Sequence, residues 1–298
     1  MLAAMTVEKL FNVLFNAGMF IMVTTLVMSL GLSFTVAQVL APLRRVGVFI
    51  AAVVINVLIV PSAAWGLAKL FPITSQQVIG LVLVCVASAG PAGLKAAQFA
   101  KRADMAFALS LVVVLQLVNI IAAPLWAQAV VTGASISVWT IIEDLLLLVL
   151  VPLVLGLVGH VRYKEHAARW RTDLEKVSNI ALVIAIAAGV AVYWTDIIDL
   201  LGSWVLVTAT VMILVFMALG ALVGLRDRAT AISGAMVTGM RFQPLGLIII
   251  MTQLSGNGAY LAPALVFALI DTVLMFGIGL ELGRRLRSGE TTVAPASV

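Results

Sequence analysis

Long apolar stretches recur along the whole chain, and they constrain its fold more than any other feature. Nine stretches of about 20 residues, each with few charges, lie between residues 12 and 283. A helix of about 20 residues crosses the hydrocarbon core of a bilayer, because each residue adds about 1.5 Å to a core about 30 Å thick. Only 10% of the 298 residues are charged and 63% are hydrophobic, too few charges to cover a soluble protein of this size. The sequence therefore predicts an all-α polytopic membrane protein.

Charged turns and Gly/Pro-rich turns divide these stretches into nine predicted transmembrane helices. They cover residues 12–34, 46–70, 76–100, 105–129, 136–161, 176–194, 203–225, 229–254 and 260–283. We interpret residues 1–298 as a single transmembrane domain. The polar end, residues 288–298, is predicted to be a disordered cytoplasmic tail.

Basic residues alternate between successive turns. They occur in the turns after the first, third, fifth and seventh helices and after the last one, at Arg44, Arg45, Lys101, Arg102, Arg162, Lys164, Arg169, Arg171, Arg226, Arg228, Arg284, Arg285 and Arg287. The intervening turns, near residues 72–75, 132–137, 195–203 and 255–258, contain no Lys or Arg. Because cytoplasmic loops of membrane proteins are enriched in Lys and Arg, the N-terminus is predicted outside and the C-terminus in the cytoplasm. The expected location is the cell membrane.

Helix-breaking residues interrupt two of the nine predicted helices. The third reaches Gly90, Pro91, Ala92 and Gly93, and the eighth contains Gly239, Met240, Pro244 and Gly246. These breaks lie about 150 residues apart, as do the flanking helices, and the odd number of helices in that offset reverses the orientation of the second unit. An inverted repeat with one discontinuous helix per half is typical of secondary transporters, which bind substrate at the breaks. Pro/Gly kinks without a function are the alternative, since membrane helices tolerate them.

Three charged residues are predicted to lie at membrane depth near these breaks: Lys95, Arg241 and Asp271. Arg241 is 13 residues from Arg228 and 14 from Ser255, too far from either helix end to reach water. A central charge costs about 2.5–3.5 kcal/mol unless it faces a cavity or a partner. A structural Arg241–Asp271 ion pair and a Lys95 side chain that reaches the inner membrane surface are the structural interpretations. The functional one is that two cations and one carboxylate leave a positive charge for an anionic substrate to balance.

Uncharged polar residues in the same helices are further candidates for the site. Gln116 and Asn119 are three residues apart and share a helix face, where they either line a cavity or join helices. The predicted substrate-binding residues are Lys95, Arg241, Asn56, Gln116, Asn119, Gln243 and Asp271.

The side-chain sets that intramembrane enzymes need are missing from the sequence. The chain has one Cys and two His, no H-E-x-x-H motif, and no second central acid to pair with Asp271. We therefore expect a protein that is not an enzyme and has no cofactor. The predicted partners are a small organic anion and the lipid bilayer, not a nucleic acid, because the basic residues lie in short turns. A channel, or a receptor derived from a transporter fold, is the alternative function.

Four short motifs follow one another in an order typical of one transporter family. They are Ser29–Ser33, Asn56–Trp65 with its internal Pro61, Gly90–Gly93, and the pair Gly239-Met240. In their order and spacing, over roughly residues 18–282, the chain resembles the bile acid:sodium symporter family. This resemblance implies a core domain of residues 46–129 and 203–283. It also implies a panel domain of residues 12–34, 136–161 and 176–194.

The positions that match the sodium sites of this family carry different side chains here. Where the resemblance implies a Ser-Asn pair, a Glu and a Gln, the chain has Ala96, Ala97, Val237 and Arg241. Sodium requires several hard oxygen ligands, and most of these have been replaced. We therefore predict anion transport that is independent of sodium or coupled to protons at Asp271. Sodium coupling through Asn56, Thr238 and backbone oxygens is the alternative.

The predicted orientation places residues 132 and 165 on opposite sides of the membrane. In a Cys85→Ala background, a membrane-impermeant thiol reagent applied to intact cells should label Thr132→Cys and not Glu165→Cys. Labelling of both variants to the same extent would contradict the predicted topology.

Overall fold

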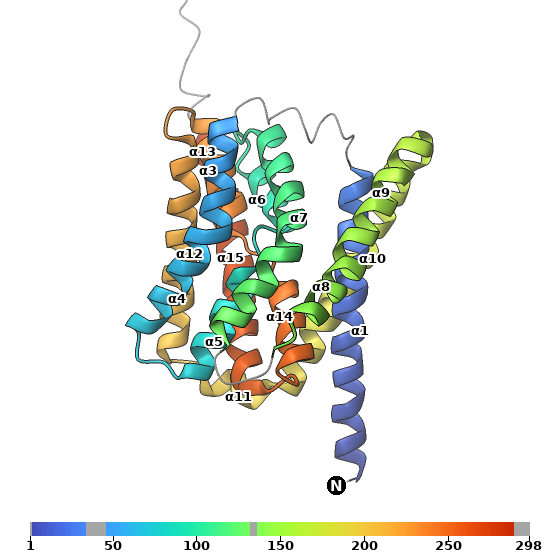
Figure 1. Ribbon diagram of the computed structural model, residues 1–298, viewed down its shortest axis with the longest axis vertical. Helices are drawn as coiled ribbons and strands as arrows, with labels where there is room; N and C mark the ends of the chain where they lie inside the picture. Colours follow the sequence, from blue (N-terminus) through green and yellow to red (C-terminus); the bar gives the residue numbers. More distant parts are fainter. Residues whose placement is uncertain (1, 34–45, 132–135, 289–298) are drawn as a thin grey trace, which may run out of the picture.

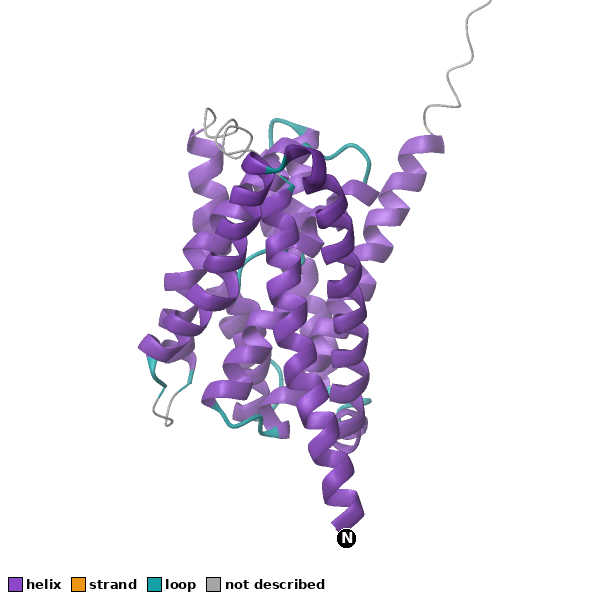
Figure 2. Ribbon diagram, turned by 90° about the vertical axis from the view of Figure 1, so that its right-hand side faces the viewer, coloured by secondary structure: helices purple, strands orange, loops and turns teal. Residues whose placement is uncertain are grey.

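The computed structural model describes residues 2–33, 46–131 and 136–288, and every regular element in these ranges is a helix (Figures 1 and 2). The predicted all-α class is therefore confirmed. The turn with Arg44 and Arg45, the turn around residues 132–135, and the predicted tail beyond Ser288 lie outside the described residues.

Eight helical stretches are long and apolar enough to cross a membrane: Lys9–Leu32, Val46–Leu70, Met105–Val130, Val138–Arg162, Lys164–Val192, Trp204–Gly224, Arg228–Gln253 and Gly258–Arg285. Helices α5 (Ser75–Val86) and α6 (Pro91–Phe99) bend by 75° at the break between them and add a ninth crossing if the pair is counted as one span. Counted this way, the stretches match the order of the nine helices predicted from the sequence.

The remaining helices follow in chain order, with the labels of Figure 1. They are α1 (Leu2–Leu32), α3 (Val46–Val54), η2 (Ile55–Ile59), α4 (Val60–Leu70), α7 (Met105–Val130), α8 (Val138–Leu145), η3 (Leu146–Leu150), α9 (Val151–Arg162), α10 (Lys164–Val192), α11 (Trp194–Asp199), α12 (Trp204–Ala221), η4 (Leu222–Gly224), α13 (Arg228–Gly239), α14 (Gln243–Gln253) and α15 (Gly258–Ser288).

Three helices extend several residues past their predicted ends. The first was expected to start at residue 12, but α1 begins at Leu2. The sixth crossing was expected to start at residue 176, but α10 begins at Lys164, so the basic turn is mostly helical. Ion pairs between Arg171 and Glu175 at 3.0 Å, and between Arg169 and Asp173 at 4.0 Å, join successive turns of this extension. The last helix, α15, likewise continues to Ser288, five residues past the predicted end at residue 283.

Helix α1 packs along α10 and α9, and these three helices stand beside the remaining bundle (Figure 1). Small residues allow the close approach. A Cβ atom built on Gly31 of α1 would lie 2.9 Å from the Cα atom of Gly156 in α9, and one on Gly18 would lie 3.1 Å from the Cβ atom of Ala185 in α10. Gly-rich contacts of this kind bring helix backbones together in membranes. The other crossings pack mainly among themselves, with α5 against α15, α4 and α14, and α12 against α13 and α15.

A π-helical turn, η2, interrupts the second crossing just before Pro61. Proline has no N–H group, so the carbonyl oxygen of Val57, four residues earlier, loses its usual helical donor. The indole Nε1–H of Trp126 in α7 donates to this oxygen at 2.7 Å. The turn also places Asn56 at the centre of the bundle, where it is fully buried.

Candidate functional site

The two helix breaks lie directly against one another in the middle of the bundle. The first comprises Ala87–Gly90 and the second Met240–Phe242. The main-chain N–H of Phe242 donates to the carbonyl oxygen of Ala87 at 3.3 Å. A Cβ atom on Gly90 would lie 2.7 Å from the Phe242 ring, so this close crossing requires glycine.

Several residues assigned to the breaks belong instead to the helices that follow. Pro91, Ala92 and Gly93 form the start of α6, and Pro244 and Gly246 lie in α14. Each proline stands in the first turn, where a missing N–H costs no helical hydrogen bond and the fixed φ angle suits the helix. Both Gly/Pro motifs therefore mark helix starts as well as helix breaks.

Asn119 of α7 holds the first break in place. Its side-chain Oδ1 accepts from the main-chain N–H of Ser88 at 3.0 Å, and its Nδ2 donates to the Ser88 carbonyl oxygen at 3.0 Å. The same Nδ2 lies 3.4 Å from Oε1 of Gln116. Non-helical backbone at membrane depth needs such partners, because lipid supplies none. Of the two interpretations of this amide pair, the structure therefore favours joining of segments over contact with a cavity.

Arg241 donates to oxygens of two other segments. Its Nε and one terminal nitrogen lie 3.0 and 2.6 Å from the carbonyl oxygen of Cys85, near the C-terminal end of α5. Its other terminal nitrogen lies 3.1 Å from Oδ1 of Asn56, and the Asn56 carbonyl oxygen is 3.4 Å from the group. The C-terminal end of a helix carries partial negative charge, which favours a cation there. The side chain is fully buried.

Asp271 of α15 does not form the ion pair that one interpretation of the sequence required. Its Oδ2 accepts from the main-chain N–H of Arg241 at 3.2 Å and from the side-chain amide of Gln243. Within the part of the chain that the structure describes, its Oδ1 has no hydrogen-bond partner. The guanidinium has turned away toward the carbonyl end of α5, so Asp271 contacts the backbone of Arg241 instead of its charge.

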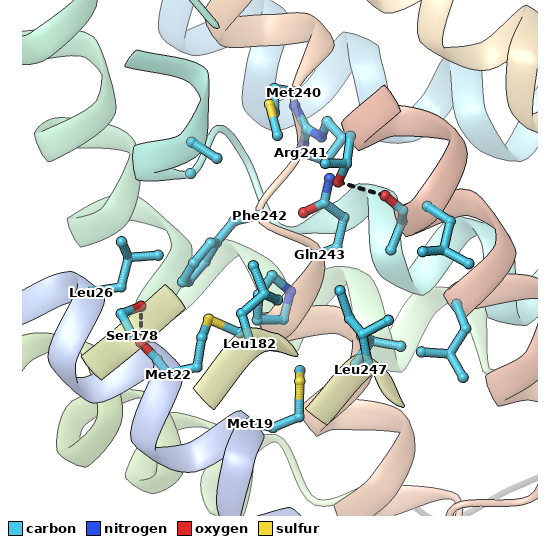
Figure 3. A pocket seen from close by; sticks show the side chains of 18 of the residues that line it. Met19, Met22, Leu26, Ser178, Leu182, Met240, Arg241, Phe242, Gln243 and Leu247 are labelled. Atoms are coloured by element: carbon cyan, nitrogen blue, oxygen red, sulfur yellow. Dashed lines mark hydrogen bonds between the residues drawn. The ribbon is translucent and has the colours of Figure 1, made fainter. Parts of the chain in front are cut away.

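A cavity of about 190 Å³ adjoins the crossing, between α1 and α10 on one side and α6, α14 and α15 on the other. Figure 3 shows Met19, Met22 and Leu26 of α1 facing Phe242, Gln243 and Leu247 across it. The residues that line it are Phe15, Met19, Met22, Leu26, Gly90, Ala92, Lys95, Ser178, Asn179, Leu182, Ile186, Val190, Met240, Arg241, Phe242, Gln243, Pro244, Leu247, Leu265, Ala268, Leu269, Thr272 and Phe276.

Three of the seven predicted substrate-binding residues line this cavity: Lys95, Arg241 and Gln243. The other four, Asn56, Gln116, Asn119 and Asp271, are buried in the bundle and do not line it. The contribution of α10, including the polar pair Ser178-Asn179, was not predicted from the sequence. A polar pair inside a predicted crossing was the available signal.

Comparison with known families gives the chain its class. The model of the sodium bile acid symporter family matches residues 20–222, which is more than half of the sequence. The chain belongs to the sodium bile acid symporter family. Members of this family are transporters rather than enzymes, as the sequence analysis predicted. No curated protein sequence matches the chain significantly.

The positions that the resemblance assigned to sodium sites carry apolar side chains or already form hydrogen bonds within the protein. Ala96, Ala97 and Val237 are fully buried and offer no side-chain oxygen. Both oxygens of Asn56 accept from Arg241, and Asn56 Nδ2 donates to Thr238 Oγ1 at 2.9 Å. Within the described residues, no group of three or more His, Cys, Asp or Glu side chains is arranged to hold a metal ion.

The clamp formed by Asn119 predicts a large loss of stability on its removal. Asn119→Leu leaves the buried N–H and C=O of Ser88 without partners, at a cost of about 1–3 kcal/mol for each group. The midpoint of thermal unfolding in detergent should fall by several degrees, whereas Asn12→Leu in α1 should change it little. Equal melting of the two variants would contradict a clamp at this break.

Proposed function

We propose that the protein is a secondary transporter that moves a small organic anion across the cell membrane by alternating access, with its N-terminus outside and its C-terminus in the cytoplasm. One observation carries this proposal. The cavity beside the helix crossing has predominantly apolar walls, and Lys95 at its edge has no ion-pair or hydrogen-bond partner among the described residues. A cation beside apolar walls favours an anion, because an unpaired charge at membrane depth is costly.

The position of the cavity supports alternating access. Its walls come from two groups of helices, one with α1 and α10 and the other with α6, α14 and α15. We assign the first group, with α8 and α9, to a panel domain, and the crossings within residues 46–129 and 203–283 to a core domain. A rigid-body movement of the core against the panel would open the cavity to one side of the membrane and then to the other.

We further propose that transport does not require sodium, because Arg241 supplies a fixed cation at the crossing. Its guanidinium already occupies the oxygens of Cys85 and Asn56 that an ion would need. A second cation 4 Å from it would be repelled by about 4 kcal/mol at an effective dielectric constant of 20. Transport would then be driven by the anion gradient alone or, if coupled, by protons at Asp271.

The role of Lys95 can be tested by binding. In lipid nanodiscs, benzoate should raise the melting temperature of the wild-type protein, and Lys95→Gln should weaken this binding at least tenfold because the cavity loses its free cation. Lys101→Gln, which removes a cation just beyond the end of α6 and outside this cavity, is the matched control. Undiminished benzoate binding by Lys95→Gln would argue against the proposed anion site.

Sodium independence is measured with the protein in proteoliposomes. Initial uptake of radiolabelled benzoate should differ by less than twofold among sodium, potassium and choline buffers at fixed pH. The reason is that the positive charge at the crossing belongs to the Arg241 side chain and not to an ion from the buffer. A tenfold or greater dependence on sodium would show that Asn56, Thr238 and backbone oxygens suffice as an ion site.

A further inference from the structure

We infer that the cavity selects small monocarboxylates with a compact apolar body, and that it excludes sterol-sized anions and dicarboxylates. This inference rests on the proposed function, since it assumes that substrate binds in the cavity. It adds the size, charge and polarity of the substrate.

The polar groups of the cavity limit how many polar atoms a substrate can have. Six lining residues have polar side chains, and four of these already donate within the protein. The Ser178 hydroxyl donates to Met22 O at 3.1 Å, that of Thr272 to Ala268 O at 2.8 Å, Arg241 to Cys85 O, and Gln243 to Asp271. Lys95 and Asn179 are the two that remain, within the part of the chain that the structure describes. They suit one carboxylate.

The charge of the cavity limits the substrate to one negative charge. The guanidinium of Arg241 is fully buried and points to oxygens of the core, so Lys95 is the cation that an occupant meets. A second carboxylate would have to leave water for apolar walls without a partner, and burial of an unpaired charge is strongly unfavourable. A dicarboxylate of the same size should therefore bind much more weakly.

The volume limits the size of the apolar body. About 190 Å³ is smaller than the range of about 300–1,000 Å³ typical of pockets for drug-sized ligands. Much of the wall consists of Met19, Leu26, Leu182, Leu247 and Phe276, which surround the space from both groups of helices. These side chains fit a branched aliphatic group or a single aromatic ring, whereas a four-ring sterol skeleton exceeds the space.

A series of probes tests the charge and size limits on the wild-type protein in nanodiscs. Benzoate and 4-methylpentanoate should bind, and benzene-1,4-dicarboxylate and cholate should each bind at least tenfold more weakly than benzoate. Benzyl alcohol, which keeps the ring without the charge, should also bind at least tenfold more weakly. Dicarboxylate binding as tight as that of benzoate would overturn the charge limit, and cholate binding as tight as that of benzoate would overturn the size limit.

A variant with an enlarged cavity tests whether the apolar body of the probe lies in this cavity. Leu182→Ala removes a lining side chain on α10 and should improve binding of 2-naphthoate at least tenfold, while Ile180→Ala, an exposed position on the same helix, should leave it unchanged. Equal effects of both variants would overturn the assignment of the apolar body to this cavity.

The outcomes separate this inference from the proposed function. If cholate binds and Lys95→Gln abolishes its binding, the anion site stands and the small-monocarboxylate inference fails. If none of the carboxylates binds in a manner that depends on Lys95, the anion site and the inference both fail.

Discussion

The hydrogen bonds of the Arg241 guanidinium hold together the helix breaks at the centre of this protein. The guanidinium donates to the carbonyl oxygen of Cys85 at the end of α5 and to Asn56 in the π-helical turn. The main-chain N–H of the same residue donates to Asp271 on α15. Three segments distant in sequence thus meet at one residue. Lipid supplies no hydrogen bonds, so backbone freed at a helix break must find its partners within the protein. A charged side chain with five N–H donors can satisfy several such groups at once.

The first break, Ala87–Gly90, meets the same need with different groups. Asn119 pairs with both main-chain groups of Ser88, and Phe242 donates to Ala87, so the two interrupted helices are joined across the crossing. These contacts engage Asn119 and the main chain of the first break within the bundle. The cavity beside the crossing has mainly apolar walls and few free polar atoms. The charge that an occupant of the cavity meets is therefore that of Lys95.

The helices could be predicted from the sequence much better than the contacts between them. A crossing needs a fixed length of apolar residues, so its position can be seen directly in the chain, and the burial of Arg241 followed from its distance to both helix ends. Its partners did not follow, because the sequence alone does not show that the carbonyl of Cys85 lies closer than the carboxylate of Asp271. The contribution of Ser178 and Asn179 was missed for a related reason: the rotation of α10, which decides what its residues face, depends on how it packs against α1.

A fixed cation also differs from a bound ion in what it can do for the proposed transporter. A sodium ion that enters with the substrate and leaves on the other side moves down its own gradient, and that movement supplies free energy for transport. Arg241 stays in the protein, so it can neutralise charge at the crossing but cannot supply energy. If Arg241 stays bound to Cys85 and Asn56 in the outward-open and the inward-open state, the charge of the empty crossing is the same in both states. The driving force must then come from the anion itself or from a group that exchanges a proton. At this crossing that group would be Asp271, whose Oδ1 has no hydrogen-bond partner among the residues that the structure describes.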